Sequence, residues 1–235
     1  MSIPMAPAKS LVLCAATSWE ARPLAKGLGL APSPSGAGRW EGTPGGHAVV
    51  LLQTGMGGRQ AVLSLSRHLK THDSVDILSI GFAGALRRGL EPGHLILDFP
   101  DSDLAARALS CAQRMRLDAS LGATADASSV IATPEEKLRL GRETGALAVD
   151  METKALKTWA RERRLTAWAI RAVLDRVDDV LPPPAPRERS SKALVDYAVS
   201  HIRFLRSMPA LAANRRRAIA SLTMFFNAFL PELCR

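Results

Sequence analysis

The sequence has little cysteine and histidine, and neither occurs in a metal-binding or redox pattern. Its 235 residues include three cysteines and five histidines, with no CxxC pair and no HExxH motif. This scarcity argues against a disulfide framework and against the usual metal-ligand spacings, so we expect no metal and no other cofactor. Free thiols suit a reducing compartment, and we therefore expect a cytoplasmic protein.

Long apolar runs and nucleotide-binding glycine motifs are also missing. No run approaches the ~20 residues of a membrane span. The apolar run 11–16 follows a lysine, as in a signal peptide. It is shorter than the ~7–15 residues of a signal-peptide core, and it has the length of a strand. Neither GxGxxG nor GxxxxGK[ST] occurs, which argues against a dinucleotide site or a P-loop.

Apolar runs that alternate with helical patterns predict the fold. Hydrophobic residues make up 47% of the chain and charged residues 23%, as in a globular protein. The expected strands are 11–16, 47–54, 76–80, 95–99, 146–149 and 168–174. The expected helices are 20–30, 59–70, 104–115, 134–142, 152–163, 190–205 and 215–230. Residues 32–46 resemble a turn-rich connection, and 117–132 fit no element.

This order predicts one α/β domain over residues 1–235, with a mixed, mostly parallel central sheet flanked by helices. The length is sufficient for one such core. We place the core at 9–184 and a basic, helical C-terminal extension at 187–235.

Carboxylates follow three of the expected strands. Asp150 and Glu152 follow one of them, with Met151 between the two. Asp175 follows another, and Glu20 comes shortly after the first strand of the chain. Because ligands of open α/β sheets bind at the carboxyl ends of the strands, we expect these side chains to line one pocket. Acids are also favoured at a helix N-terminus, and for the acids at 150 and 152 this alternative stays open.

Glycine-rich segments follow two further strands. They are Gly55-Met56-Gly57 and Gly81-Phe82-Ala83-Gly84. Glycine permits positive φ and lets another group approach the backbone closely. The segments fit either ordinary tight turns or walls of the pocket that the carboxylates would line.

Positive charge is concentrated at the end of the chain. The net charge is +9, and residues 187–235 carry nine Lys or Arg against three acids. This charge fits either a solvated face or an anionic partner such as a membrane or nucleic acid; we expect no nucleic acid. Arg215-Arg216-Arg217 precede a Phe-rich helix, which could lie in the inner membrane interface or pack on the core or a second subunit.

Several of these segments, in this order, resemble the purine nucleoside phosphorylase and nucleosidase family, which includes the methylthioadenosine/adenosylhomocysteine nucleosidases. The resemblance covers about residues 11–182. It rests on segments 54–57, 81–85 with 90–93, 148–152 and 170–175. The run 133–152 and the basic tail look most like the hopanoid-associated branch, which is linked to adenine removal from adenosylhopane. The family implies a three-layer fold, a nucleoside substrate and a homo-oligomer, of which we favour a dimer.

The resemblance implies a role for each carboxylate. Asp175 matches the acid that, when protonated, delivers a proton toward purine N7. Glu152 matches the carboxylate that binds the ribose hydroxyls, with Met151 packed beneath the sugar. Glu20 matches the acid that orients the attacking water in nucleosidases. The remaining substrate-binding residues are expected to be Asp150, Gly55, Met56, Gly57, Phe82, Ala83 and Gly84.

The chemistry agrees with these roles. Cleavage of an N-glycosidic bond passes through an oxocarbenium-like state, so the leaving purine needs a proton and the cationic sugar needs negative charge nearby. Clustered acids raise at least one pKa, which keeps a proton available near neutral pH.

Departures from the family concern the support of the acid and the nucleophile. Leu174 replaces a serine whose hydroxyl would support Asp175, and Asp150 replaces a glutamate. Segment 124–131 lacks the aromatic residue that stacks on adenine in relatives. Segment 15–20 offers an acid instead of a phosphate-binding glycine turn, so we prefer water as the nucleophile.

We therefore expect hydrolysis of an adenosine-like nucleoside with a 5′ substituent. A phosphate-dependent phosphorylase is the alternative, and Arg59, Arg87 and Arg88 would form its anion subsite. A non-catalytic protein that binds a nucleoside or docks on a membrane is the third interpretation.

Overall fold

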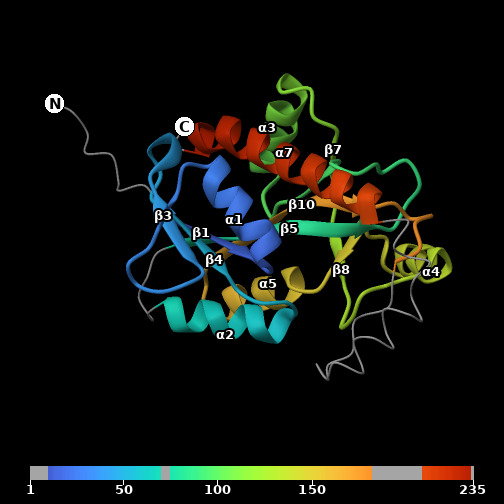
Figure 1. Ribbon diagram of the computed structural model, residues 1–235, viewed down its shortest axis with the longest axis horizontal. Coiled ribbons are helices and arrows are strands. Elements are labelled where there is room, and N and C mark those ends of the chain that lie inside the picture. Colours follow the sequence, from blue (N-terminus) through green and yellow to red (C-terminus); the bar gives the residue numbers. More distant parts are fainter. Residues whose placement is uncertain (1–9, 70–74, 182–207, 234–235) are drawn as a thin grey trace.

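The computed structural model describes residues 10–69, 75–181 and 208–233, and within them one ten-stranded sheet carries helices on both faces (Figure 1). The strands are β1 (Ser10–Ala15), β2 (Ala31–Pro32), β3 (Arg39–Gly42), β4 (Val49–Gln53), β5 (Val75–Ala85), β6 (Leu95–Asp98), β7 (Ala119–Leu121), β8 (Thr124–Asp126), β9 (Ala148–Asp150) and β10 (Thr166–Asp175). The helices are α1 (Ser18–Gly27), α2 (Gly58–His68), α3 (Ser102–Arg114), α4 (Pro134–Thr144), α5 (Thr153–Glu162) and α7 (Met208–Leu233), with the 3-10 turn η1 (Pro44–Gly46).

The centre of the sheet is parallel, and antiparallel pairs occur toward its margins. The strand order is β2-β3-β4-β1-β5-β10-β6-β7, with β9 pairing to β5 and β8 pairing to β9. The central strands β4, β1, β5 and β10 are mutually parallel, whereas β6 runs antiparallel to β10 and β9 antiparallel to β5. The predicted mixed, mostly parallel sheet is confirmed. The parallel centre brings the ends of β1, β5 and β10 to the same edge.

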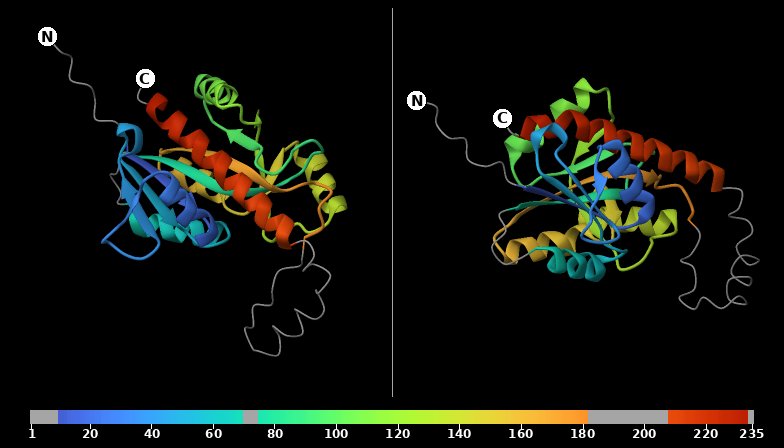
Figure 2. Two further views of the ribbon diagram at one scale, coloured as in Figure 1. Left: turned by 45° about the horizontal axis from the view of Figure 1, so that its top comes forward. Right: turned by 60° about the vertical axis from the view of Figure 1, so that its left-hand side comes forward.

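Helices cover the sheet in two layers. α1, α3 and α7 lie over one face, and α2 and α5 over the other (Figure 2). The main core joins the first layer to the sheet and contains Trp168 of β10 together with Phe225 and Phe229 of α7, all essentially inaccessible to solvent. Thus α7 is part of the central core rather than an appended segment.

The packing of α7 corrects the membrane interpretation of the Phe-rich segment. Phe225, Phe226 and Phe229 have 0% of their surface exposed, so this face packs on the sheet and is not available to a membrane interface. The alternative of a packed helix is confirmed. Among the helices of residues 10–69, 75–181 and 208–233, none combines the length and the hydrophobicity that a membrane span needs.

Other expectations also need correction. The connection 32–46 contains β3, which pairs with β4; its half-buried Arg-Trp-Glu-Gly sequence shows no apolar run. The segment 81–84 is not a turn, because β5 continues through it to Ala85. Residues 117–132, which the sequence left unassigned, include the short strands β7 and β8. The expected helix 190–205 lies outside the described residues.

Helix α4 begins as its sequence predicts. Thr133 accepts a hydrogen bond from the backbone N–H of Glu136, whose carboxylate in turn accepts from the N–H of Thr133. This reciprocal capping box, with Pro134 at the first helical position, satisfies N–H groups that have no partner within the helix. The start of α4 is therefore fixed, and with it the position of Lys137 one turn later.

Candidate active site

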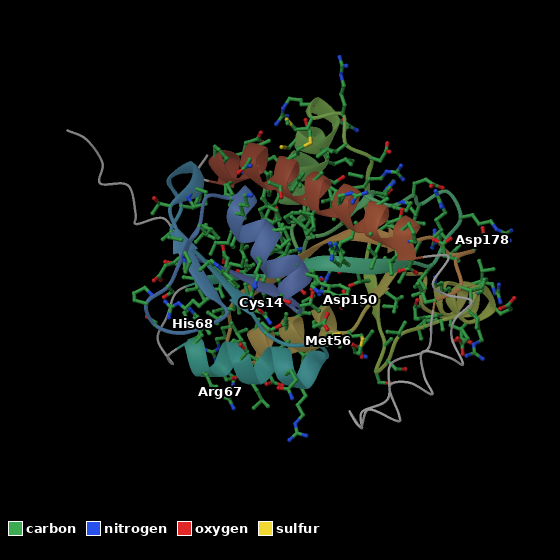
Figure 3. The ribbon with its side chains drawn as sticks, in the orientation of Figure 1. Cys14, Met56, Arg67, His68, Asp150 and Asp178 are labelled. Atoms are coloured by element: carbon green, nitrogen blue, oxygen red, sulfur yellow. The ribbon has the colours of Figure 1, made fainter. Side chains whose placement is uncertain are left out.

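A cavity of about 440 Å³ opens at the edge of the sheet where β1, β5 and β10 end. Four carboxylates line it: Glu20, Asp150, Glu152 and Asp175. Each of the four residues has 6% or less of its surface exposed. The strand-end acids of the sequence therefore meet around one cavity. Figure 3 shows Asp150 and Met56 near each other in this region, whereas Asp178 lies away from them beside α4.

Glu20 is held at the start of α1 by both of its carboxylate oxygens. Oε2 accepts hydrogen bonds from the backbone N–H and the hydroxyl of Thr17, at 2.8 and 2.7 Å. Oε1 accepts from the backbone N–H of Phe82 at 2.8 Å. The carboxylate approaches Gly81 of β5 so closely that a Cβ at this position would clash with it, and the φ of Gly81 is +152°. Glycine is therefore required at position 81 for Glu20 to lie in the cavity.

A buried arginine that the sequence analysis missed, Arg171, lies behind two of the acids. It comes from the middle of β10 and is 1% exposed. Its Nε lies 3.1 Å from Asp150 Oδ2, and its Nη2 lies 3.5 Å from Glu152 Oε2. A lone arginine in an otherwise apolar run was the available signal, because a charged side chain in a buried strand requires partners of opposite charge.

Asp150 has a structural role as well as its place in the cavity. Its Oδ1 accepts hydrogen bonds from the backbone N–H groups of Glu152 and Thr153, both at 2.8 Å, at the start of α5. Its Oδ2 faces Arg171. The helix-start alternative therefore describes Asp150 well, although the residue also lines the cavity.

Glu152 connects the glycine segment 55–57 to Arg171 through its two carboxylate oxygens. Its Oε1 accepts a hydrogen bond from the backbone N–H of Gly57 at 2.7 Å. Gly57 adopts a φ of +88°, which a residue with a side chain disfavours. Burial raises the pKa of the Glu152 carboxyl, and the Arg171 charge and the Gly57 hydrogen bond oppose this rise.

Asp175, at the end of β10, forms a buried ion pair with Lys137 of α4. The distance between Lys137 Nζ and Asp175 Oδ2 is 2.6 Å. Burial raises the pKa of Asp175, while the ammonium of Lys137 acts in the opposite direction. Lys137 was not predicted from the sequence, because a lysine in the first turns of an acidic helix fits a solvated face equally well.

The two glycine segments contribute differently from each other. Met56 lines the cavity with 66% of its surface exposed, whereas Gly55 and Gly57 are not among the lining residues and Gly57 acts through Glu152. Phe82, Ala83 and Gly84 also line the cavity, as does Met151.

The outer part of the cavity is mostly apolar. Segment 124–131, which has no aromatic residue, contributes Val130 and Ile131 to the lining. Trp19, Leu181 and Leu211 are also among the apolar lining residues. The four carboxylates are the buried polar side chains of the lining, whereas Trp19 and Met56 are exposed.

The expected arginine subsite for an anion is not formed. Arg59, Arg87 and Arg88 do not line the cavity. Arg87 donates to the carbonyl of Gly145, and Arg88 pairs with Asp178. Arg215, whose guanidinium lies 5.3 Å from the Trp19 ring centre, is the one cation among the described lining residues.

No group of three or more His, Cys, Asp or Glu in residues 10–69, 75–181 and 208–233 is arranged to hold a metal ion. Of the two described cysteines, Cys14 lies in β1 with its thiol pKa raised by burial to about 12. A thiol with such a pKa is not a nucleophile near neutral pH.

Comparisons with known structures support the fold. The chain superposes on a methylthioadenosine/adenosylhomocysteine nucleosidase from Neisseria meningitidis in complex with methylthio-immucillin-A, with a TM-score of 0.70, 16% identity and coverage of 95% of this chain and 99% of the other. The methylthioadenosine/adenosylhomocysteine nucleosidase of Streptococcus pneumoniae with 8-aminoadenine gives a TM-score of 0.64, 22% identity and coverage of 93% and 99%. Futalosine hydrolase of Helicobacter pylori gives 0.66, 16%, 93% and 97%.

Comparisons of the sequence itself give the family. No curated protein sequence matches the chain. The family model described as the phosphorylase superfamily matches residues 11–98 and 96–208, most of the chain. The chain belongs to the phosphorylase superfamily.

Proposed function

We propose that the chain is a nucleosidase, which hydrolyses the N-glycosidic bond of an adenosine-like nucleoside with a 5′ substituent. The observation that carries this proposal is the convergence of Glu20, Glu152 and Asp175 on one cavity. Membership of the phosphorylase superfamily supports it, as does the fold shared with the nucleosidases and futalosine hydrolase.

In this proposal the three carboxylates divide the reaction between them. Asp175 gives its proton to N7 of the purine, and the electrons of the breaking C1′–N9 bond pass to the base. Glu152 accepts hydrogen bonds from the ribose hydroxyls, and its charge stabilises the oxocarbenium-like sugar. Glu20 orients a water that attacks C1′, and the proton lost by this water returns to solvent or to Asp175. General acid catalysis of this kind typically contributes ~10²–10⁴-fold.

Water is favoured over phosphate as the nucleophile by the charges around the cavity. Four carboxylates line it, against Arg215 as the described lining cation. Arg171 is already paired with Asp150 and Glu152. A phosphate dianion would therefore meet net negative charge, whereas a neutral water would not.

The apolar outer lining supports an apolar 5′ substituent. Trp19, Leu181 and Leu211 lie at this end of the cavity, and Trp19 has 62% of its surface exposed. The described cation there is Arg215, beside Trp19, so a substituent that carries an ammonium group, which Arg215 would repel, fits this lining less well than a hydrocarbon. The hydrocarbon of adenosylhopane, the substrate linked to the branch that the sequence resembles, is a substituent of this kind.

Product analysis tests the proposal. The purified protein is incubated with methylthioadenosine, adenosylhomocysteine, inosine and an adenosine with a long 5′-alkyl group, with and without phosphate. The proposal expects release of free adenine and free sugar without phosphate, with the alkyl substrate giving the highest kcat/KM. Strict dependence on phosphate would instead identify a phosphorylase. Absence of turnover, with nucleoside binding intact, would identify a binding protein.

We also propose a cytoplasmic homodimer: the family resemblance implies a homo-oligomer, of which we favour a dimer, and the cysteine usage suits a reducing compartment. Light scattering on the purified protein would then give twice the chain mass of 25.2 kDa. A mass equal to that of one chain contradicts the dimer without affecting the proposed chemistry.

A further inference from the structure

Lys137 is a fully buried lysine directly behind Asp175. It lies on α4 with 0% of its side chain exposed, and it does not line the cavity. Its Nζ donates to Asp175 Oδ2 at 2.6 Å. The other two donors go to the backbone carbonyls of Arg176 and Asp179, at 2.8 and 2.9 Å. All three N–H groups of the ammonium are therefore used, and the charged head is fixed in one orientation.

This contact gives Asp175 a support that its neighbour in sequence cannot provide. Leu174, the preceding residue, has no hydroxyl. The Asp175 carboxyl also packs against Gly84 of β5, where a Cβ would lie 3.1 Å from Oδ2 and 3.6 Å from Oδ1. The carboxyl is thus confined between α4 and β5, with Oδ2 bound to Lys137.

We propose that Lys137 is the positioning residue of Asp175: it binds Oδ2 so that Oδ1 faces the purine, and its charge sets the protonation equilibrium of this acid. The catalytic part of the proposal rests on the proposed nucleosidase function. The positioning part concerns the carboxyl alone and is measurable without a substrate.

The charged groups around Asp175 determine the sign of the effect. Lys137 faces it from α4 and Asp179 from the loop that follows β10. The neighbouring residues Gly84 of β5 and Val149 of β9 do not titrate. Burial raises the pKa of Asp175, Lys137 lowers it, and Asp179 raises it. Loss of the Lys137 charge therefore raises this pKa further.

Two variants and a matched control test the proposal. Lys137→Met removes the charge at similar volume. Lys137→Gln removes the charge but keeps two N–H donors for the carbonyls of the loop, so it serves if the Met variant does not fold. Lys154→Met makes the first change at an exposed lysine of α5. Carboxyl ¹³C NMR follows the titration of Asp175, whose signal is assigned by its loss in Asp175→Asn.

The proposal expects the Asp175 titration to move to higher pH in both Lys137 variants and to stay unchanged in Lys154→Met. It expects kcat/KM to fall about 10- to 100-fold, since misplacement of a reacting group by ~1 Å costs about 100-fold. The alkaline limb of the pH–rate profile moves to higher pH along with the titration. In an Asp175→Asn background, Lys137→Met causes no further loss of activity.

An unchanged Asp175 titration overturns the proposal, whatever the turnover. Equal losses of activity from Lys137→Met with and without Asp175 also overturn it, because they assign Lys137 a merely structural role. If the wild-type protein turns over no nucleoside, the proposed function fails, and the NMR titration still decides whether Lys137 controls Asp175.

Discussion

Replacement of Asp175 by Asn removes the proton donor of the proposed reaction while it preserves the local contacts. The Asn side chain has the same shape, and its carbonyl oxygen can still accept the hydrogen bond from Lys137 Nζ that Asp175 Oδ2 accepts at 2.6 Å. The amide has no acidic proton to deliver to N7. Loss of a general acid costs ~10²–10⁴ in rate, and at about 1.4 kcal/mol for each factor of ten this corresponds to about 3 to 5 kcal/mol of transition-state stabilisation.

The pH profile gives the prediction a sign. The general acid is active in its protonated form, so kcat/KM falls as pH rises through the pKa of Asp175. Burial raises this pKa, although Lys137 opposes the rise, so the fall lies above the range of an exposed aspartate. In Asp175→Asn this descending limb disappears together with most of the rate.

Steady-state release of adenine over a range of pH, with thermal unfolding measured in parallel, is the appropriate assay. Asp178→Asn is the matched control: Asp178 lies three residues away, pairs with Arg88 at the surface and is absent from the cavity lining. Wild-type kcat/KM in Asp175→Asn refutes the acid role. A loss explained by unfolding would appear as a lowered melting temperature, which the control is not expected to show.

Three further changes test other parts of the account. Arg171→Met leaves the buried carboxylates of Asp150 and Glu152 without their counter-charge, so we expect the free energy of unfolding to fall by about 3–5 kcal/mol. This loss diminishes as pH falls, because the carboxyls become protonated. A loss that does not change with pH in denaturant titrations would argue against these ion pairs. Phe225→Ala, at a site with 0% exposure, should lower the free energy of unfolding by ~3–5 kcal/mol. A decrease of no more than about 0.5 kcal/mol, as for a surface substitution, would mean that α7 is not part of the core. Trp19→Ala should raise KM for a 5′-alkyl nucleoside much more than for adenosine itself. An equal rise for both substrates would mean that Trp19 does not contact the 5′ substituent.

The position of Asp175 was predictable from the sequence because it depends on local pattern and simple topology. Asp175 ends β10, and parallel strands such as β1, β5 and β10 end at one edge of the sheet. Glu152 follows β9, which runs antiparallel to β5, so the same rule does not account for its position in the cavity. The helix start at Thr133, and with it the start of α4, could also be predicted, since it depends on residues within one turn.

The buried cations were not predictable in the same way. The partners of Arg171 come from β9 and the start of α5, and their approach depends on the pairing of β10 with β5. Lys137 reaches Asp175 across 38 positions of sequence, a contact that no helical periodicity indicates. The Phe-rich sequence of α7 fits a helix in a membrane interface and a helix packed on the core equally well, and only the tertiary structure shows that it is packed. β3 was not predicted because this short, half-buried strand carries no apolar run.

A crystal structure with a non-hydrolysable 5′-alkylthio adenosine analogue would show whether the three carboxylates bind one nucleoside. We predict the purine N7 within hydrogen-bond distance of Asp175, the ribose hydroxyls on Glu152, and the alkyl group along Trp19 and Leu211. An analogue bound at another surface, or with its base away from Asp175, would contradict this prediction.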